Sequence, residues 1–430
     1  MMILNRDRLA IHGGAPIIDE PFPPYRSLGY EEIEAANRVL ESGVLSAYVG
    51  APGEGFMGGP QVRALESEAA TYFGVRHAIA VNSWTSGLIA AVGAIGTEPG
   101  DEIIVPPWTM VATATAIVQW NAIPVFADID PQSFNIDPEA VEQAITPRTR
   151  AIMSVDIFGQ SADMQRLRGI AVRHGLKLLS DTAQAPGARY KSSYAGTLAD
   201  IGGYSLNYHK HIHCGEGGLL VTNDDRYAQR LRLIRNHGEA VIDSDDPSEL
   251  ANIVGFNFRL GEIESAVARA QLRKLADKVR SRQAAVERIR AGLSGLLGLS
   301  LPRVSPDCTH VYYLFGMRLD LDTLGTDRAA IVRALRAEGV TGLGAGYQNI
   351  HRLPMFRNGI AYGKHGFPWK GLPGETSRRP STQSCPIAER LHDHDLFYLN
   401  TCAHEYSSHQ TDLVIAAFQK VWENIKSLRE

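Results

Sequence analysis

Apolar residues in the first two thirds of the chain alternate between helical spacing and short continuous runs. In residues 61–73, Val62, Leu65 and Ala69 lie about one helical turn apart, which predicts a helix with one buried face. Continuous apolar runs predict strands at 78–81, 102–105, 124–128, 151–155 and 176–181. Apolar strands that alternate with helices are typical of an α/β fold, with a mainly parallel central sheet and helices on both of its faces.

Several helix ends are marked by residues that suit them. Asp137 is a suitable N-cap and Pro138 a suitable first residue for a helix within 135–145. A helix over 162–175 is predicted to end at Gly175. A long helix is predicted to begin near Gly261 and to continue, with breaks, to about residue 293.

The pattern changes after about residue 305. Residues 312–322 predict a strand and residues 327–339 a helix, whereas residues 355–383 are rich in glycine, proline and basic residues and predict a long loop. We therefore expect two domains. A large domain over residues 1–280 includes the N-terminal segment, and a smaller α+β domain covers residues 281–430.

Charge and composition exclude several classes of protein. The 43 Lys and Arg residues balance 47 Asp and Glu residues, and no long basic block is present, so nucleic acid is not an expected partner. The longest apolar stretch, at 87–96, is about half of what a membrane span needs. The N-terminus lacks the pattern of a secretory signal, and the four cysteines form no CxxC pair. We expect a cytoplasmic protein with free thiols.

The stretch SLNYHKHIHCGEGG, at 205–218, concentrates reactive side chains. His209, His211, His213 and Cys214 are residue types that zinc favours, but no second cluster of such ligands lies nearby in the sequence, and Lys210 would place a cation beside the metal. A second interpretation is a solvated loop, since histidines in a polar loop are often simply exposed to water. A third is that the lysine is the reactive group, because a partly neutral lysine forms Schiff bases.

The surrounding residues favour the lysine interpretation. A pyridoxal phosphate enzyme needs a Schiff-base lysine, a carboxylate for the ring nitrogen, a phosphate-binding turn and a group that covers the ring. Asp181 ends an apolar strand, where a buried carboxylate needs a cationic partner, although it would also serve as a helix N-cap. Hydroxyl residues follow the strand at 78–81, at a junction that suits phosphate but also resembles an ordinary N-cap; they are Ser83, Thr85 and Ser86.

Five segments together resemble the DegT/DnrJ/EryC1/StrS family of sugar aminotransferases, over nearly the whole chain. They are RALESEAATYFGVRHAIAVNS (63–83), PPWTMVATATAIVQWNAIPVFADIDPQSFNIDP (106–138), LLSDTAQAPGA (178–188), ADIGGYSLNYHKHIHCGEGGLLVTND (199–224) and GFNFRLGEIESAVARAQLRKL (255–275). The resemblance implies the type I aspartate-aminotransferase fold, with the cofactor bound by the large domain.

The resemblance also implies a role for each matching residue. Lys210 matches the catalytic lysine that holds pyridoxal 5'-phosphate, Asp181 the carboxylate on the pyridine nitrogen, and Gln184 the glutamine near the ring hydroxyl. The implied phosphate ligands are Thr85, Ser86, Ser205 and, from the partner subunit, Asn257. That last match implies a homodimer with shared sites, and no metal is expected.

Three positions depart from the family pattern. Trp84 replaces a glycine that is usual in the phosphate turn, so the backbone there is not predictable. Met110 lies where an aromatic ring often covers the cofactor, and a thioether packs on such a face. Trp108 is an alternative for that role and equally a candidate for the core. Asp156 replaces a common histidine and is open to a role in substrate choice.

The implied reaction moves an amino group from glutamate or glutamine, through pyridoxamine 5'-phosphate, to a keto-sugar. The acceptors implied are nucleotide-linked sugars, keto-cyclitols and oxidised sugar acids. A sugar dehydratase of the same fold is an alternative, but such members carry histidine at the lysine position, and a shift to His209 or His211 would break the spacing to Ser205. A non-catalytic regulatory member of the fold is the other alternative.

Overall fold

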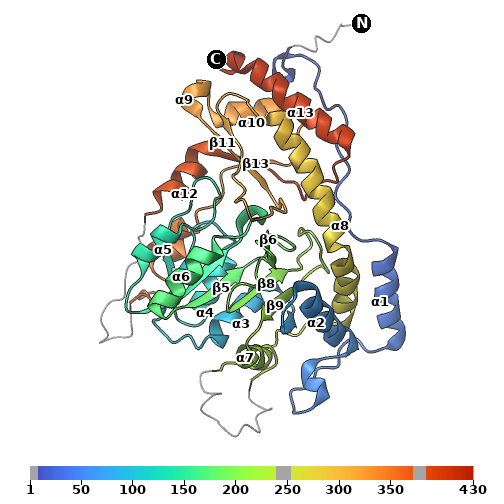
Figure 1. Cartoon of the computed structure of the whole chain (residues 1–430), viewed down its shortest axis with the longest axis vertical. Helices are drawn as coiled ribbons and strands as arrows, with labels where there is room; N and C mark the ends of the chain where they lie inside the picture. Colours follow the sequence, from blue (N-terminus) through green and yellow to red (C-terminus); the bar gives the residue numbers. More distant parts are fainter. Residues whose placement is uncertain (1–7, 239–252, 371–383, 430) are drawn as a thin grey trace.

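A seven-stranded mixed sheet forms the centre of the larger part of the molecule (Figure 1). The computed structural model describes residues 8–238, 253–370 and 384–429. Five neighbouring strands are parallel, and β9 runs antiparallel between β8 and β1. In spatial order the strands are β1 (His77–Val81), β9 (Gly218–Thr222), β8 (Ile201–Ser205), β5 (Lys177–Asp181), β4 (Thr149–Val155), β2 (Glu102–Val105) and β3 (Ile123–Phe126).

Helices cover both faces of this sheet, because alternate side chains of the buried strands point to opposite sides. One face packs against α3 (Trp84–Ala94), α4 (Ala112–Gln119) and α7 (Asp225–Arg235). The other face packs against α2 (Pro60–Phe73), α5 (Pro138–Ala144), α6 (Met164–His174) and α8 (Glu262–Leu293). The predicted α/β architecture is confirmed.

The predicted helix ends agree with the structure, but the predicted interior of the long helix does not. The Asp137 carboxylate accepts the backbone N–H of Glu139, and Gly175 ends α6 with φ 66°, a backbone conformation that favours glycine. The breaks predicted in the long helix are wrong, since α8 is continuous over 32 residues. It contains no proline, and its one glycine, Gly292, lies in the last turn, so nothing within it interrupts the hydrogen bonding.

A four-stranded antiparallel sheet forms the smaller C-terminal part, in the order β10 (Leu299–Ser300), β11 (Phe315–Leu319), β13 (Leu396–Leu399) and β12 (Leu343–Ala345). It shares a hydrophobic core with α10 (Arg328–Ala337), α13 (Ser408–Glu423) and the C-terminal half of α8. The strand predicted at 312–322 is shorter than expected, since β11 covers only Phe315–Leu319. Because α8 passes through residue 280, it contacts both sheets' cores, and the domain division there stays a prediction.

The remaining elements are short or lie at the margin of the molecule. They are α1 (Tyr30–Ser42), β6 (Arg189–Tyr190), β7 (Ser193–Tyr194), α9 (Leu321–Leu324), α11 (Pro354–Asn358) and α12 (Pro386–Arg390). Helix α11 lies within the loop predicted at 355–383, of which 371–383 lie outside the described residues. No helix in the described ranges has the length and apolar composition of a membrane span.

Candidate active site

The candidate site lies where β1, β5 and β8 end at one edge of the large sheet. These three strands run in the same direction, so their carboxyl ends meet at this edge, where ligands of open α/β sheets bind. Asp181 is the last residue of β5 and Ser205 the last of β8, and the turn at 82–86 follows β1. Lys210 follows five residues after Ser205.

Lys210 is buried, and burial favours its neutral form. Its side chain is 8% exposed, and Nζ lies 4.4 Å from the centroid of the Tyr313 ring. Burial lowers the pKa of Lys210 to about 8, although the nearby Asp181 carboxylate opposes this effect. Among the described residues it has no ion-pair partner at salt-bridge distance. The neutral, nucleophilic fraction of this amine near neutral pH, about a tenth at pH 7, is therefore far larger than for an exposed lysine.

The Asp181 carboxylate is held by three hydrogen-bond donors. Oδ1 accepts the indole N–H of Trp84 at 2.7 Å and the backbone N–H of Ala183 at 3.1 Å. Oδ2 accepts the hydroxyl of Thr113 at 2.7 Å, and that hydroxyl is 2.6 Å from the hydroxyl of Thr109. All three groups that touch Asp181 are donors, which matches an ionised carboxylate, because a carboxylate only accepts.

Thr109 and Thr113 were missed by the analysis of the sequence. Both are buried; Thr113 is the second residue of α4, and Thr109 lies just before this helix. The signal that could have found them is a pair of hydroxyl residues at i and i+4 within an otherwise apolar segment, directly after a predicted strand.

The turn after β1 is built as the N-terminus of α3. Ser83 caps the helix by accepting the backbone N–H of Ser86 at 3.0 Å, and the Ser86 hydroxyl donates to Asn82 at 2.7 Å. Thr85 is exposed at the second residue of the helix. Free N–H groups and hydroxyls at a helix N-terminus are a suitable binding site for phosphate.

Strand pairing brings Ser205 near this turn. Ser205 is paired with Gly218, and Gly218 with Val81, so Ser205 and the end of β1 lie two strands, or about 10 Å, apart. A Cβ on Gly218 would lie 3.0 Å from the carbonyl oxygen of Ser83, so the turn approaches β9 closely there. The last glycine of GEGG is required by this approach.

Gln184 is fixed by partners on both sides of its amide. Its Oε1 accepts the backbone N–H of Phe158 at 2.8 Å, and its Nε2 donates to the hydroxyl of Tyr347 at 3.1 Å. Burial raises the pKa of Tyr347 to about 12, so this hydroxyl keeps its proton. Tyr347 and Tyr313 both come from the C-terminal part of the chain, where the sequence contained no signal that linked them to the site.

Met110 and Trp108 occupy opposite environments. The Trp108 ring is fully buried beside Phe134 and Phe158, and its N–H donates to Asn349 at 2.9 Å. The Met110 side chain is 67% exposed, at the start of the segment that leads into α4. Trp108 therefore belongs to the core, and Met110 is the residue of the two that remains accessible to a ligand.

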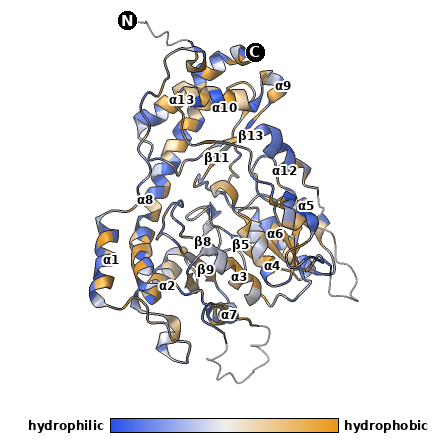
Figure 2. Cartoon of the chain, turned by 180° about the vertical axis from the view of Figure 1, so that it is seen from behind, coloured by the Kyte–Doolittle hydropathy of each residue, from blue (hydrophilic) through white to orange (hydrophobic). Residues whose placement is uncertain are grey.

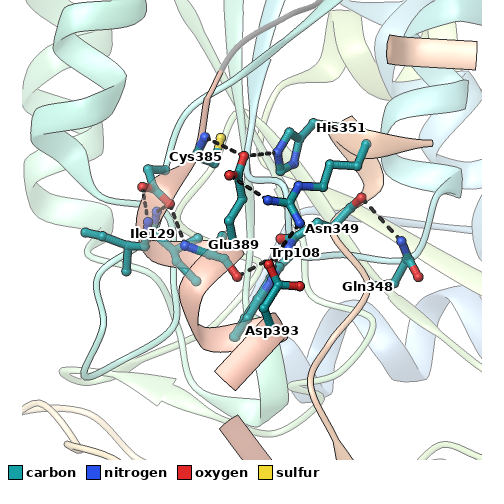
Figure 3. Close-up of polar contacts among 12 residues, drawn as sticks. Trp108, Ile129, Gln348, Asn349, His351, Cys385, Glu389 and Asp393 are labelled. Carbon is teal, nitrogen blue, oxygen red and sulfur yellow. Dashed lines mark hydrogen bonds and ion pairs between the residues drawn. The ribbon is translucent and has the colours of Figure 1, made fainter. Parts of the chain in front are cut away.

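A polar network ties the C-terminal part to the segments that follow β2 and β3 (Figure 3). The Asp128 carboxylate, after β3, accepts the backbone N–H groups of Ile387 and Ala388 at the start of α12. Glu389 of the same helix accepts hydrogen bonds from His351 at 2.8 Å and Arg352 at 2.7 Å. These contacts, with the bond from Trp108 to Asn349, hold the segment that carries Tyr347.

The family model "DegT/DnrJ/EryC1/StrS aminotransferase family" matches residues 29–369 of the chain. The chain belongs to this aminotransferase family. The predicted family and the predicted pyridoxal-phosphate-dependent transaminase activity are thereby confirmed.

Individual members of the DegT/DnrJ/EryC1/StrS family are similar over nearly the full length. "Spore coat polysaccharide biosynthesis protein SpsC" of Bacillus subtilis is 33% identical over 87% of this chain and 94% of its own. "dTDP-3-amino-3,4,6-trideoxy-alpha-D-glucose transaminase" of Streptomyces venezuelae is 35% identical over 87% and 93%. The structure of S. venezuelae DesV, in complex with a ketimine intermediate, is 31% identical, covers 91% and 94%, and superposes with a TM-score of 0.76.

Asn257, expected to reach the partner's phosphate in this aminotransferase family, is exposed. Its carbonyl oxygen accepts the side-chain N–H of Asn82 of the same chain at 3.4 Å, and the neighbouring Phe258 carbonyl accepts the Asn82 backbone N–H at 2.9 Å. The segment thus lies beside the turn at 82–86 of its own chain. The contribution to a second subunit stays a prediction.

The three histidines around Lys210 have separate environments. His209 is exposed on one side only. Burial of the rest of its side chain and the charge of Lys210 lower the pKa of His209 to about 4. His211 is fully buried and bonds to the carbonyl of Val311 at 2.8 Å, while the backbone N–H of His213 donates to Gln271. Within the described part of the chain, no group of three or more potential ligands could hold a metal ion.

Asp156 has an internal role. It is fully buried, and its oxygens accept hydrogen bonds from Ala162 N at 2.8 Å, Thr182 at 2.7 Å and Ser180 at 3.3 Å. Burial raises its pKa to about 6. These contacts hold the ends of β4 and β5 together, which accounts for the residue without a substrate.

Proposed function

We propose that this aminotransferase moves an amino group from glutamate or glutamine to the keto group of a sugar, with pyridoxal 5'-phosphate held at Lys210. The observation that carries the proposal is a buried lysine, with its pKa lowered to about 8, beside the buried carboxylate of Asp181. That pair supplies a nucleophilic amine and an anion for a protonated ring nitrogen.

The residues at the strand ends fit the cofactor. When bound, pyridoxal phosphate supplies an electron-accepting ring. Asp181 would pair with the ring nitrogen, and Gln184, with Tyr347 behind it, would lie near the ring hydroxyl. Met110 would cover the ring. The phosphate would be held by Thr85, Ser86, Ser205 and Asn257 of the partner subunit.

Lys210 would then serve as base and acid. Once its amine is free, a group with a pKa near the working pH can take a proton from the substrate carbon and return it at the next position. The Tyr313 ring against Nζ limits where the amine can move and helps to exclude water. Asp181 offers no competing ion pair at salt-bridge distance.

Two features support a sugar as the acceptor. The similar S. venezuelae protein is named for a transaminase of a dTDP-linked amino sugar, and the B. subtilis protein for polysaccharide biosynthesis. The Tyr313 ring packs against the Lys210 amine and the exposed imidazole of His209 lies beside that ring, and polar aromatic groups of this kind suit a hydroxylated substrate. Keto-cyclitols and oxidised sugar acids share this chemistry.

The proposal is tested by following both halves of the reaction. We expect the visible absorbance of the purified enzyme loaded with pyridoxal phosphate to fall when L-glutamate or L-glutamine is added. It should return when a dTDP- or GDP-linked keto-sugar is added, with an aminated sugar detected by mass spectrometry. If neither amino acid changes the absorbance, the proposed transfer is refuted.

The dehydratase and regulatory alternatives are not favoured by the site. A dehydratase would need a histidine in place of Lys210. His211 is hydrogen-bonded to the carbonyl of Val311 in the core, and His209 is one residue too close to Ser205 to take the place of Lys210. A regulatory protein would not need the intact set of Lys210, Asp181 and Gln184 in contact with their present partners.

We also propose a homodimer that uses the outer face of α1. This helix lies at the margin of the molecule (Figures 1 and 2), and it exposes Tyr30, Ile33 and Leu40 by 75%, 60% and 55%. Apolar side chains that continue beyond the helix, at Val44 and Leu45, enlarge the patch. A second copy of the chain would cover it and bring Asn257 to the neighbouring site.

The dimer is tested by sedimentation of a charged variant. We expect the wild type to sediment as a dimer and Ile33→Glu/Leu40→Glu to sediment as a monomer with reduced cofactor affinity. Val172→Glu, which changes an equally exposed apolar residue on α6, is the matched control and should remain dimeric. A monomeric wild type, or a dimeric double variant, would exclude this face.

A further inference from the structure

Trp84 is the first residue of α3, and its indole ring lies inside the molecule. Its exposed fraction is 6%. Two glycines leave the space that it fills. A Cβ on Gly203 of β8 would lie 2.4 Å from Cη2 of the indole, and one on Gly87 would lie 2.8 Å from Cε3. Side chains at these two glycines and the present indole are mutually exclusive.

The indole reaches Asp181 because of the strand register. Asp181 of β5 is paired with Gly203 of β8, and paired residues point to the same face of a sheet. A ring that covers Gly203 therefore lies beside the carboxylate of Asp181. The indole N–H donates to Oδ1 at 2.7 Å, and both residues are buried.

The remaining capacity of this carboxylate is limited. Two carboxylate oxygens offer about four acceptor positions. Oδ1 uses two, for Trp84 and for the backbone N–H of Ala183, and Oδ2 uses one, for the hydroxyl of Thr113. One position is left, on Oδ2. A buried anion with one free acceptor position is suited to a single further donor.

We propose that Trp84 is a positioning residue for the cofactor: its N–H fixes the Asp181 carboxylate so that the free position on Oδ2 faces the pyridine nitrogen. This inference rests on the proposed function, because it needs the cofactor ring to lie against Asp181. It gives a role to a tryptophan at a turn where glycine is usual, and it fits the two glycines, Gly87 and Gly203, that border the indole.

Trp120 provides a matched control within the same hydrophobic cluster. It is also buried, at 7% exposed, and lies against a glycine, since a Cβ on Gly93 would lie 2.0 Å from its ring. Its N–H donates to a backbone carbonyl, that of Ile89, at 2.8 Å, rather than to Asp181. Replacing either indole by phenylalanine removes one buried N–H and a similar volume.

The test compares Trp84→Phe with Trp120→Phe in two measurements. One is the dissociation constant of pyridoxal phosphate from the apoprotein, by equilibrium dialysis. The other is the ¹⁵N chemical shift of the ring nitrogen in bound, labelled cofactor. We expect Trp84→Phe to raise the dissociation constant about tenfold or more, as for the loss of a hydrogen bond to a charged group, and to shift the ¹⁵N signal. Trp120→Phe should change neither.

A double-mutant cycle separates this role from packing. In an Asp181→Asn background, Trp84→Phe should have a much smaller effect on cofactor affinity, because the two residues act through one contact. Equal cofactor affinity and an unchanged ¹⁵N shift in Trp84→Phe would overturn the inference, as would effects that simply add in the double variant. If the wild type itself fails to bind the cofactor at Lys210, the proposed function fails instead.

Discussion

Replacement of Lys210 by alanine is expected to reduce amino transfer by at least about 1,000-fold, because the same amine holds the cofactor and moves the proton. The variant should lose the visible absorbance of the lysine-bound cofactor. Burial lowers the pKa of this amine to about 8 from a usual value of 10.5. The rate at which the wild-type apoprotein captures pyridoxal phosphate should therefore rise between about pH 7 and 9 and then level off.

Two comparisons make the Lys210 result specific. Lys177 lies at the amino end of β5, opposite the carboxyl end that carries Asp181. Lys177→Ala should therefore leave both the absorbance and the activity unchanged. A small primary amine such as methylamine should restore part of the activity of Lys210→Ala, since the missing side chain leaves a space in which the added amine can carry the proton, although it cannot anchor the cofactor to the chain. Full activity in Lys210→Ala would refute the assignment.

Substitution of Asp181 by asparagine is expected to weaken binding of pyridoxal phosphate about 100-fold or more. The asparagine keeps the volume but cannot stabilise a protonated ring nitrogen, and breaking one member of a buried charged pair costs about 2–5 kcal/mol. The dissociation constant, measured by equilibrium dialysis, should rise. The rate at which the amino donor lowers the visible absorbance of the bound cofactor should fall with it.

Asp156→Asn is a close control for that substitution. Asp156 is also buried, at the neighbouring strand end, and accepts three hydrogen bonds, but none from a residue assigned to the cofactor. This variant should alter thermal stability and leave cofactor affinity within a few fold. If Asp181→Asn binds the cofactor as tightly as Asp156→Asn does, Asp181 does not contact the ring.

The elements of the large sheet were predictable because their signals are local. Continuous apolar runs identified β1, β2, β3, β4 and β5, and Asp137 and Gly175 marked helix ends. The uninterrupted course of α8 was not predicted, although the segment contains no proline and its one glycine lies in the last turn; the helix packs against α1, α2 and α13, which its local spacing does not reveal.

The candidate site was predictable only where residues follow strands. Lys210, Asp181 and Ser205 follow or end strands of one sheet, so their proximity could be inferred. Tyr313 and Tyr347 reach the site from the C-terminal part over more than 100 residues of sequence, and no local pattern marks such contacts. The bond from Trp84 to Asp181 depends on the register of β5 with β8 and on the glycine at 203, which is a property of the folded sheet.

Borohydride reduction of the enzyme loaded with pyridoxal phosphate shows directly whether Lys210 binds the cofactor. Reduction makes the link between lysine and cofactor permanent, and digestion followed by mass spectrometry locates it. The account predicts a single pyridoxyl group on the peptide that contains Lys210. A group on another lysine, or none after reduction of a cofactor-saturated sample, would contradict it.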